Sequence, residues 1–438
     1  MGATRRRALL RFAAYGGVAG AAYGWFGVKW ARTSLSGRIG AAGGAGSGDG
    51  QSTDSARRGP APSASQLATD DVSAPGATPA GRVLRVGPEH EITSLARAAA
   101  VARDGDTILI TPGDYRGDVA VWEQPRLTLR AEGGAVRVIA DGKSAEGKGN
   151  WVVRGDAVLI EGVEFIGSRV PHRNGAGIRF ERGRLTLRRC RFLDNEMGLL
   201  TSNDAEARLI VESCAFIGNG RDDGHNHNLY VGTIDRLSVT ASYFARARIG
   251  HLLKSRARES VITYNRLSDE PGGRASYELE FPNGGRVLAM GNLIAQEAST
   301  ENPAIVSYAA EGYRWPDNKL FAVHNTVANR GEGPSVFVKV HGSAASGLVA
   351  NNLWCGPGNL ELPPSVRERD NAHPWPFEFR DADRFDYRLL PIAAMLRSVD
   401  ALGEEAGFGL VPRAQYVHPL ALQPFTAGRS LVAGALQS

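Results

Sequence analysis

Short runs of alternating apolar and polar residues recur along the chain from residue 158 onward. Each run is too short for a helix and rich in β-branched residues, so it predicts a strand with one buried face. The successive runs read VLIEGVEF, LTLRRCRF, LIVESCAF, LSVTASYF, SVITYNRL, RVLAMGNLI, LFAVHNTV and GLVANNLW. A second β run follows most of them: GIRFE, GLLTS, NLYVG, GHLLKS, YELEF, AIVSY and SVFVKV. The pattern predicts a repeating all-β architecture.

A small or amide residue stands two places before an apolar residue in each of these units. It occupies Val163, Cys190, Cys214, Ser242, Asn265, Asn292, Asn325 and Asn352, with spacings of 27, 24, 28, 23, 27, 33 and 27 residues. A period of this size with insertions is typical of a solenoid. Asparagine at one turn of successive units can form hydrogen bonds along the stack, and it tolerates the left-handed backbone of such turns. The repeat therefore favours a coil that stacks each strand on its equivalent.

This column resembles the asparagine ladder of the pectin-lyase-like superfamily, whose fold is a right-handed parallel β-helix. Residues 94–115, SLARAAAVARDGDTILITPGDY, resemble the family's first segment, in which an amphipathic helix caps the open end of the solenoid. Residues 385–391, FDYRLLP, resemble its closing strand. The resemblance implies an all-β parallel β-helix over residues 82–392, followed by a tail, residues 393–438, that packs on the solenoid.

The charge of the chain is concentrated at its N-terminus. The 438 residues carry 51 Lys and Arg against 46 Asp and Glu, but nine of the basic residues and two of the acidic ones precede residue 59. The remainder holds 42 basic and 44 acidic residues and is nearly neutral. A nucleic-acid-binding protein would need a basic surface, so no nucleic-acid partner is expected. Three cysteines are too few for a disulfide framework.

The first 32 residues predict export. An arginine cluster, TRRR, precedes an uncharged stretch from Phe12 to Val28, as in a secretory signal or a short membrane anchor. Residues 33–81 are rich in Gly, Ala, Ser and Pro and predict a flexible linker. We expect a periplasmic or extracellular protein, anchored in the inner membrane if residues 1–32 are retained. No other membrane contact is expected, and a monomer is the expected state.

Strand alternation predicts which side chains leave the coil. The inward positions are taken as Leu229, Val231, Leu253, Ser255, Leu279, Phe281, Val336, Val338 and Val340. The residues between them are then expected to face outward: Asn228, Tyr230, Lys254, Arg256, Glu278, Glu280, Lys339 and His341. Stacked strands lie about 4.8 Å apart, so these side chains would form one patch. His225, His227, His251 and Tyr277 fall in the same neighbourhood.

Such a patch holds the groups that a lyase of acidic polysaccharides needs. Removing the proton next to a uronate carboxyl requires a cation on that carboxyl, a base, and an acid for the leaving oxygen. Lys254 is the candidate base, Arg256 the carboxylate partner, and Tyr230 or His251 the proton donor. Glu278 and Glu280 form a candidate Ca²⁺ site. Substrate contacts are expected from His225, His227, Asn228, Tyr277, Lys339 and His341.

The stretch LLKSRARESV also resembles part of the site of some β-helix lyases, the alginate lyase and chondroitinase B group. Those enzymes place a lysine in a KS context, an arginine one rung later, and calcium on acidic residues. In this chain the later arginine is absent, and Glu280 or Pro282 stands about where it would be.

Other interpretations of the same residues stay open. Lys254 and Arg256 could pair with Glu278 and Glu280 across strands on a solvated face, each pair contributing ~0.2–1 kcal/mol. The protein would then be a non-catalytic glycan-binding or cell-envelope structural module. The two glutamates could alternatively act as the acid pair of a glycoside hydrolase. A metal on His225 and His227 lacks a third ligand at a recognisable spacing, so a polar loop is the simpler interpretation of that segment.

Overall fold

The computed structural model describes residues 81–438 except 427, 429 and 438, and these belong to the compact unit Pro60–Ser438. The expected signal or anchor, residues 1–32, and the linker up to residue 80 lie outside the described residues. Within the described residues, no helix has both the length and the apolar character of a membrane span.

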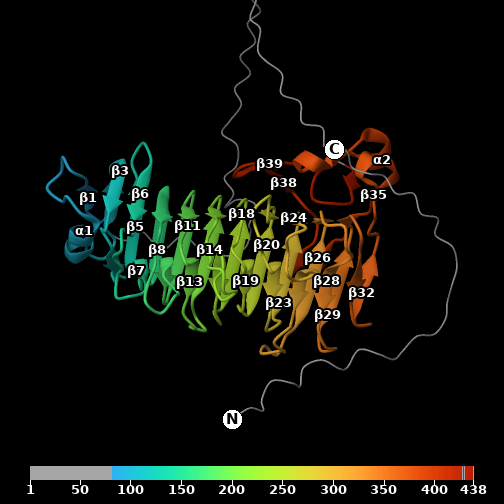
Figure 1. The fold of residues 1–438 in the computed structure, drawn as a ribbon, viewed down its shortest axis with the longest axis horizontal. Coiled ribbons are helices and arrows are strands. Elements are labelled where there is room, and N and C mark those ends of the chain that lie inside the picture. The colour runs from blue at the N-terminus through green and yellow to red at the C-terminus, as the bar shows by residue number, and fades with distance from the viewer. Residues whose placement is uncertain (1–80, 427, 429, 438) are drawn as a thin grey trace, which may run out of the picture. The chain divides into compact units, whose positions relative to one another are not determined.

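The described residues build three large parallel sheets (Figure 1). Each full rung of the coil adds one strand to each sheet, and one further strand extends the first sheet at each of its two ends. Sheet 1 has 12 strands: β1 (Val83–Val86), β2 (Thr107–Ile110), β5 (Arg126–Ala131), β8 (Ala157–Glu161), β11 (Arg184–Arg188), β14 (Arg208–Glu212), β17 (Arg236–Thr240), β20 (Glu259–Thr263), β23 (Arg286–Met290), β26 (Lys319–Val323), β29 (Ser346–Ala350) and β32 (Val366–Arg369). Sheet 2 has ten: β4 (Ala120–Trp122), β7 (Gly149–Val153), β10 (Ala176–Phe180), β13 (Met197–Thr201), β16 (Leu229–Val231), β19 (His251–Ser255), β22 (Tyr277–Phe281), β25 (Ala304–Tyr308), β28 (Ser335–Val340) and β31 (Gly358–Glu361). Sheet 3 has ten: β3 (Gly113–Arg116), β6 (Val136–Ile139), β9 (Val163–Ile166), β12 (Arg191–Leu193), β15 (Ala215–Ile217), β18 (Tyr243–Ala245), β21 (Arg266–Ser268), β24 (Leu293–Gln296), β27 (Thr326–Asn329) and β30 (Leu353–Cys355). The chain is thus the parallel β-solenoid that the repeat predicts.

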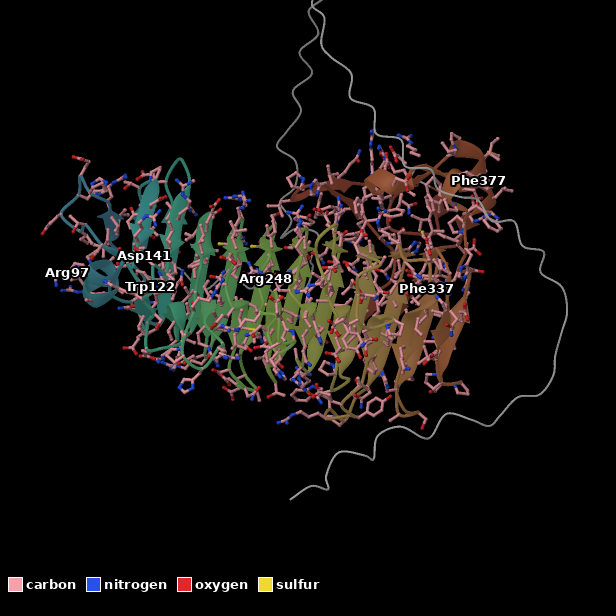
Figure 2. All side chains as sticks on the ribbon, viewed as in Figure 1. Arg97, Trp122, Asp141, Arg248, Phe337 and Phe377 are labelled. Atoms are coloured by element: carbon pink, nitrogen blue, oxygen red, sulfur yellow. The ribbon has the colours of Figure 1, made fainter. Side chains whose placement is uncertain are left out.

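Aromatic side chains fill much of the interior of the coil. Trp122 and Phe337, labelled in Figure 2, are fully buried near opposite ends of the solenoid. Between them, Phe165, Phe192, Phe216 and Phe244 stack on successive rungs of sheet 3 with ring centroids 4.5 to 5.2 Å apart. Because equivalent positions repeat on every rung, one apolar residue type per position gives a continuous packed column.

The predicted asparagine ladder is present and buried. Asn265 donates its backbone and side-chain N–H groups to Oδ1 of Asn292, both at 3.0 Å. The same pair of bonds joins Asn292 to Asn325 and Asn325 to Asn352. Asn371 extends the ladder by one rung, with Asn352 as donor at 3.0 and 2.9 Å. The turn is therefore fixed by side chains that satisfy buried backbone donors.

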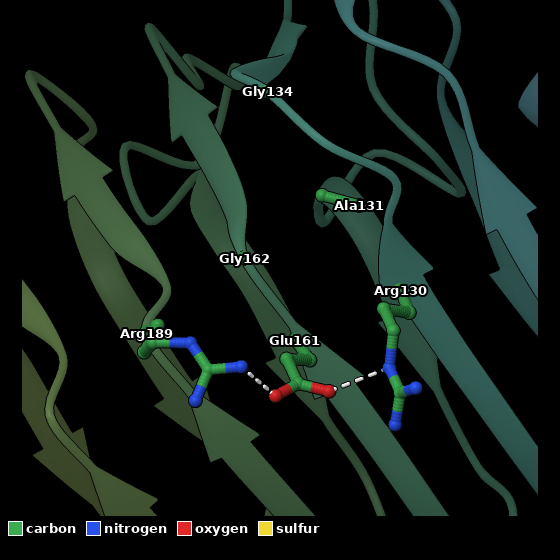
Figure 3. A pocket seen from close by; sticks show the side chains of 6 residues that line it. All are labelled: Arg130, Ala131, Gly134, Glu161, Gly162 and Arg189. Atoms are coloured by element: carbon green, nitrogen blue, oxygen red, sulfur yellow. Dashed lines mark hydrogen bonds and ion pairs between the residues drawn. The ribbon is translucent and has the colours of Figure 1, made fainter.

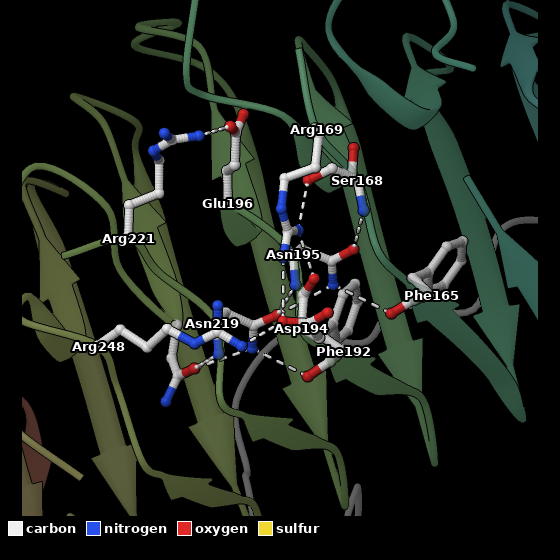
Figure 4. Close-up of polar contacts among 11 residues, drawn as sticks. Phe165, Ser168, Arg169, Phe192, Asp194, Asn195, Glu196, Asn219, Arg221 and Arg248 are labelled. Carbon is white, nitrogen blue, oxygen red and sulfur yellow. Dashed lines mark hydrogen bonds and ion pairs between the residues drawn. The ribbon is translucent and has the colours of Figure 1, made fainter. Parts of the chain in front are cut away.

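A second, shorter ladder lies after the strands of sheet 3 (Figure 4). Ser168 donates its backbone N–H to Oδ1 of Asn195 at 2.9 Å, and Asn195 donates to Oδ1 of Asn219 at 3.0 Å. Asn219 in turn donates to Oδ1 of Asn228 at 3.1 and 2.8 Å. Asn228 is therefore buried in this corner of the coil, and the expectation that it faces outward is wrong.

Helix α1 (Leu95–Val101) lies at the N-terminal end of the solenoid (Figure 1). Ser94 is its N-cap, with Oγ accepting a hydrogen bond from the backbone N–H of Arg97. Leu95 and Ala98 are fully buried in the same apolar cluster as Val86 and Ile108 of the first rungs. Leu95, Ala98 and Ala99, spaced three and four residues apart, thus give the helix one buried face that packs on the coil.

The residues after the last coil strands form short helices and small pairs of antiparallel strands. They are η2 (Pro376–Glu378), β33 (Phe379–Asp381), η3 (Ala382–Arg384), β34 (Asp386–Leu389), α2 (Pro391–Leu396), β35 (Ser398–Val399), β36 (Glu404–Glu405), β37 (Phe408–Gly409), β38 (Ala414–Val417), β39 (Ala421–Pro424) and β40 (Leu431–Val432). The strand expected to close the coil is β34, which pairs antiparallel with β33 instead of joining a large sheet. The parallel sheets thus end by Arg369 and not near residue 392.

These C-terminal elements cover outward apolar side chains of two sheets. Tyr387, Leu389 and Leu436 share a buried cluster with Leu293 of β24 and Leu353 of β30. A separate cluster joins outward residues of sheet 1 to the β37 region: Tyr264, Leu288, Met290, Phe321, Val323, Leu348, Ala350, Phe408 and Leu410. Among the residues that the structure describes, none from a strand of sheet 2 belongs to either cluster.

Candidate functional site

The candidate site lies on the outer face of sheet 2, where one column of side chains leaves the coil. Tyr230, Lys254, Glu280, Ser307 and Lys339 stand opposite one another in register on β16, β19, β22, β25 and β28. The neighbouring inward residues Leu229, Leu253, Leu279 and Val338 are buried as predicted, and Val306 continues their column. The alternation within the strands therefore predicts correctly which of these two columns points inward and which points outward.

Lys254 occupies the centre of this face and lies between two carboxylates. Its Nζ is 3.1 Å from Oε2 of Glu280 and 3.1 Å from Oε1 of Glu311. The lysine side chain is 11% exposed, so it is largely enclosed by its partners. Lys254 thus forms two ion pairs, one with a residue of β22 and one with a residue of the turn after β25.

Arg256 fixes a second cation beside Lys254. Its Nε donates to the hydroxyl of Tyr230 at 3.0 Å, and its Nη1 donates to Oδ1 of Asn283 at 2.5 Å. Nη1 and Nη2 also lie 2.6 and 2.8 Å from the carboxylate oxygens of Glu311. Trp315 donates its indole N–H to the backbone carbonyl of Arg256 at 3.1 Å. Four residues thus hold the guanidinium and its backbone in one position.

His251 lies against Glu280 on the neighbouring rung. Its Nδ1 is 2.9 Å from Oε2 of Glu280, outside the alignment of a regular hydrogen bond, and is shielded from solvent. The ring nitrogen available to a ligand is therefore Nε2. Burial lowers the pKa of His251, although Glu280 opposes this shift. The imidazole is thus neutral near pH 7, with a carboxylate placed to stabilise its charged form.

His227 supports His251 from the preceding rung. The backbone N–H of His251 donates to Nδ1 of His227 at 2.9 Å, so a neutral His227 carries its proton on Nε2. The two rings lie 4.4 Å apart, and the His227 ring contacts Tyr230 edge-on at 5.3 Å. Burial strongly lowers the pKa of His227, so it stays neutral. His227 therefore positions His251 and offers a hydrogen-bond donor at Nε2, but it carries no charge.

The two glutamates of the site are ionised for different reasons. Burial raises the pKa of Glu280, but His251 and Lys254 outweigh that effect and the net pKa is below the usual value. The hydrogen bond from Arg256 is the main cause that lowers the pKa of Glu311, to about 2. At neutral pH the face therefore holds two cations, two carboxylates and neutral imidazoles.

Glu278 does not belong to this face, contrary to the sequence-based expectation. It is fully buried opposite Leu252, and its Oε2 accepts a hydrogen bond from Nε2 of Gln296 at 3.3 Å. Burial raises the pKa of Glu278 well above its usual range. Glu278 and Glu280 thus face different surroundings and do not fit a shared Ca²⁺ site. Within the part of the chain that the structure describes, no three His, Cys, Asp or Glu side chains are arranged to hold a metal ion.

The remaining predicted contacts lie at the margins. His225 is exposed in its turn, and Tyr277 packs edge-on against His251 at 4.9 Å. Lys339 is paired with Glu361 at 2.8 Å. His341 accepts a hydrogen bond on its carbonyl from Tyr313 at 2.6 Å, and burial lowers its pKa.

Sequence reasoning missed Glu311, Asn283 and Trp315, which all lie in turns that fold back over the strands. A signal was available, since the longest repeat spacing, 33 residues between Asn292 and Asn325, contains two of the three. An insertion of this kind on a solenoid commonly lies on the binding face. Its contacts with Lys254 and Arg256 could not be read from the spacing.

A shallow pocket of about 350 Å³ lies on a different sheet (Figure 3). Glu161 of β8 lies between Arg130 of β5 and Arg189, which follows β11, with the Arg130 contact at 2.7 Å. The two arginine side chains are 51% and 66% exposed. Glu161 and the two arginines neutralise one another on an open surface, which makes this pocket a weaker candidate than the enclosed face of sheet 2.

The chain was compared with known proteins. No protein-family model matches it, and no curated protein matches it in sequence. It is similar to the crystal structure of pectate lyase Pel9A, with 13% sequence identity and a TM-score of 0.45, over 82% of this chain and 96% of that one. The three parallel sheets and the buried asparagine ladder make the described residues a parallel β-helix.

Proposed function

We propose that this protein is an exported, polysaccharide-active β-helix protein that cleaves a uronate-containing glycan by β-elimination on the outer face of sheet 2. One observation carries the proposal. Two cations, Lys254 and Arg256, lie beside a neutral histidine that contacts a carboxylate, with a tyrosine hydroxyl held by the arginine. The export part of the proposal rests on the sequence of residues 1–32.

Binding of a uronate carboxylate falls to Lys254 and Arg256. Ion pairing with the substrate carboxyl would acidify the neighbouring C5–H and stabilise the negative charge that develops when its proton leaves. The guanidinium can bind a carboxylate through two parallel hydrogen bonds. Tyr277, Lys339 and the histidines at the margins would contact neighbouring sugar units.

The base in this proposal is His251 instead of Lys254. Nζ of Lys254 is engaged by two carboxylates at 3.1 Å, whereas His251 is neutral and has Nε2 available. In the reaction Nε2 takes the C5 proton, the C4–C5 double bond forms and the C4–O bond breaks. Glu280 stabilises the resulting imidazolium.

Tyr230 is the proton donor for the leaving oxygen. Its own oxygen accepts a hydrogen bond from Arg256 Nε, which leaves its hydroxyl proton free to be donated. The proton lost from Tyr230 returns through solvent from His251 after product release, which restores both groups.

The test is an ultraviolet absorbance assay with the full-length protein. It is incubated with pectate, alginate and glucuronate-containing polymers, with calcium or with a chelator, and unsaturated uronates are recorded. The expected result is an absorbance rise with one class of polymer that is lost in His251→Ala and in Lys254→Ala and retained in Lys143→Ala, an exposed lysine in a distant turn. Full activity in His251→Ala with retained folding contradicts its role as the base.

A second candidate is a glycan-binding module without catalysis. It is favoured by the mutual pairing of all four charged groups, which is also what a structural ion-pair network would show. This function predicts saccharide binding without product. Reducing ends without unsaturated sugars would instead indicate a hydrolase.

A further inference from the structure

Glu311 is the outermost charged group of the site and covers both cations. Its side chain is 45% exposed, whereas those of Lys254 and Arg256 are 11% and 17% exposed. Its two oxygens contact both Nη atoms of Arg256 and Nζ of Lys254. The side chain thus holds one carboxylate against the two cations, in the geometry that a bound acidic ligand would require.

The two cations keep their positions without Glu311. Arg256 retains its bonds to Tyr230 and Asn283, and Lys254 retains Glu280. Removing the Glu311 side chain would therefore uncover a prepared site with one positive charge in excess. A ligand carboxylate would restore neutrality, and the strands would not need to move for it to bind.

The backbone around Glu311 is fixed, so a ligand has to displace one side chain and no loop. Glu311 donates its backbone N–H to the carbonyl of Pro282 at 2.9 Å, and Arg314 donates to the carbonyl of Asn283 at 3.0 Å. Tyr313 ties the same turn to His341. The exposed carboxylate is the movable part of an otherwise anchored turn.

We propose that the Glu311 carboxylate occupies the subsite that a carboxylate of the sugar ligand takes, and that it competes with the ligand for Lys254 and Arg256. This inference rests on the proposed function, and it names the group that sets selectivity. A neutral sugar cannot replace the charge of Glu311, so neutral sugars do not bind at this subsite. A uronate can, because its carboxylate takes the place of the Glu311 carboxylate.

The experiment is isothermal titration calorimetry of the full-length protein with galacturonate, guluronate and glucuronate trisaccharides, and with a neutral glucose trisaccharide. Glu311→Gln removes the competing charge and keeps the size of the side chain. The expected result is a Kd for one uronate at least tenfold lower than in the wild type, with no gain for the neutral sugar. The gain should vanish in the double variant Glu311→Gln, Arg256→Gln.

Glu405→Gln is the matched control. Glu405 is 40% exposed and pairs with Arg367 of sheet 1, so its removal changes the net charge equally without freeing a cation of the candidate site. An equal gain in this control, unchanged affinity in Glu311→Gln, or no uronate binding by any form would each overturn the inference. The absorbance assay separates the two proposals. If the protein catalyses β-elimination but Glu311→Gln binds uronates no more tightly than the wild type, the proposed function stands and only the competition by Glu311 is refuted.

Discussion

Oε2 of Glu280 lies within 3.1 Å of both Nδ1 of His251 and Nζ of Lys254, so one buried carboxylate serves two groups of the site. Glu280 is 2% exposed, and its loss would leave both partners without this anion. The positions of the candidate base and of the neighbouring lysine therefore depend on the same residue.

Glu280→Gln should reduce turnover and stability together. In the proposed reaction kcat falls by about 10²–10⁴, because His251 loses the group that stabilises its charged form, while KM changes little. Removing one partner of a buried ion pair should also lower the free energy of unfolding by about 3–5 kcal/mol. Steady-state kinetics and urea denaturation measure the two effects. Glu361→Gln is the control, and equal kcat values in the two variants would contradict the role of Glu280.

Asp269→Asn should stabilise the protein at pH 8 and have little effect at pH 4. Burial raises the pKa of Asp269 to about 7, and its Oδ1 has no partner. The folded state then binds more protons than the unfolded state between about pH 4 and 7, so this group lowers stability as the pH rises through that window. Asparagine imitates the protonated form and can accept the same 2.7 Å bond from the backbone N–H of Ala275.

Urea midpoints of wild type and Asp269→Asn at pH 4, 5.5 and 8 measure this effect, with a gain on the order of 1–3 kcal/mol at pH 8. Asp370→Asn, at an exposed position, is the control. A difference between wild type and variant that is the same at all three pH values would contradict the prediction.

Asn292→Ala should destabilise the solenoid by about 3 kcal/mol or more, since it leaves buried groups of the preceding rung without partners. Asn265 loses the acceptor of its backbone and side-chain donors, and the carbonyl of Ile262 loses its 2.8 Å donor. Thermal unfolding measures the loss. Asn359→Ala, in exposed strand β31, should change stability by less than about 0.5 kcal/mol; similar losses for both variants would count against the ladder.

Phe408→Ala should loosen the C-terminal elements from sheet 1. The Phe408 ring packs 5.8 Å from the ring of Phe321, and the guanidinium of Arg286 lies over it at 5.0 Å. Truncation of a buried phenylalanine costs about 3–5 kcal/mol. Limited proteolysis should then cleave after residue 369 earlier than in the wild type. Phe377→Ala, at a 74% exposed ring, should leave the cleavage rate unchanged, and equal cleavage of both variants would argue against the docking role of Phe408.

The fold could be predicted because its signals are local and repeat. Alternation gives each strand one inward face, and the column from Asn265 to Asn352 gives the turn that stacks. Neither signal shows where the last rung lies. FDYRLLP has the pattern of a strand, yet its partner is the neighbouring β33, because the coil had already ended.

The facing of the site residues could be predicted within strands, but not where the chain turns from one sheet into the next. Lys254 and Glu280 leave the coil as alternation requires, but Leu252 and Leu253 are consecutive and both fully buried. Where the chain turns from one sheet into the next, two successive side chains can both be enclosed, and Glu278 occupies the equivalent position. Glu311 lies in a turn with no periodic pattern, so its contact with Arg256 depends on tertiary structure alone.

Strand β32 also determines whether copies of the protein can join end to end. It is the last strand of sheet 1, and three of the four side chains in its sequence VRER are charged and exposed. A second molecule that continued the sheet would have to bury these charged side chains at the joint. With α1 packed on the first rungs, growth of the coil into a fibre is opposed at both ends.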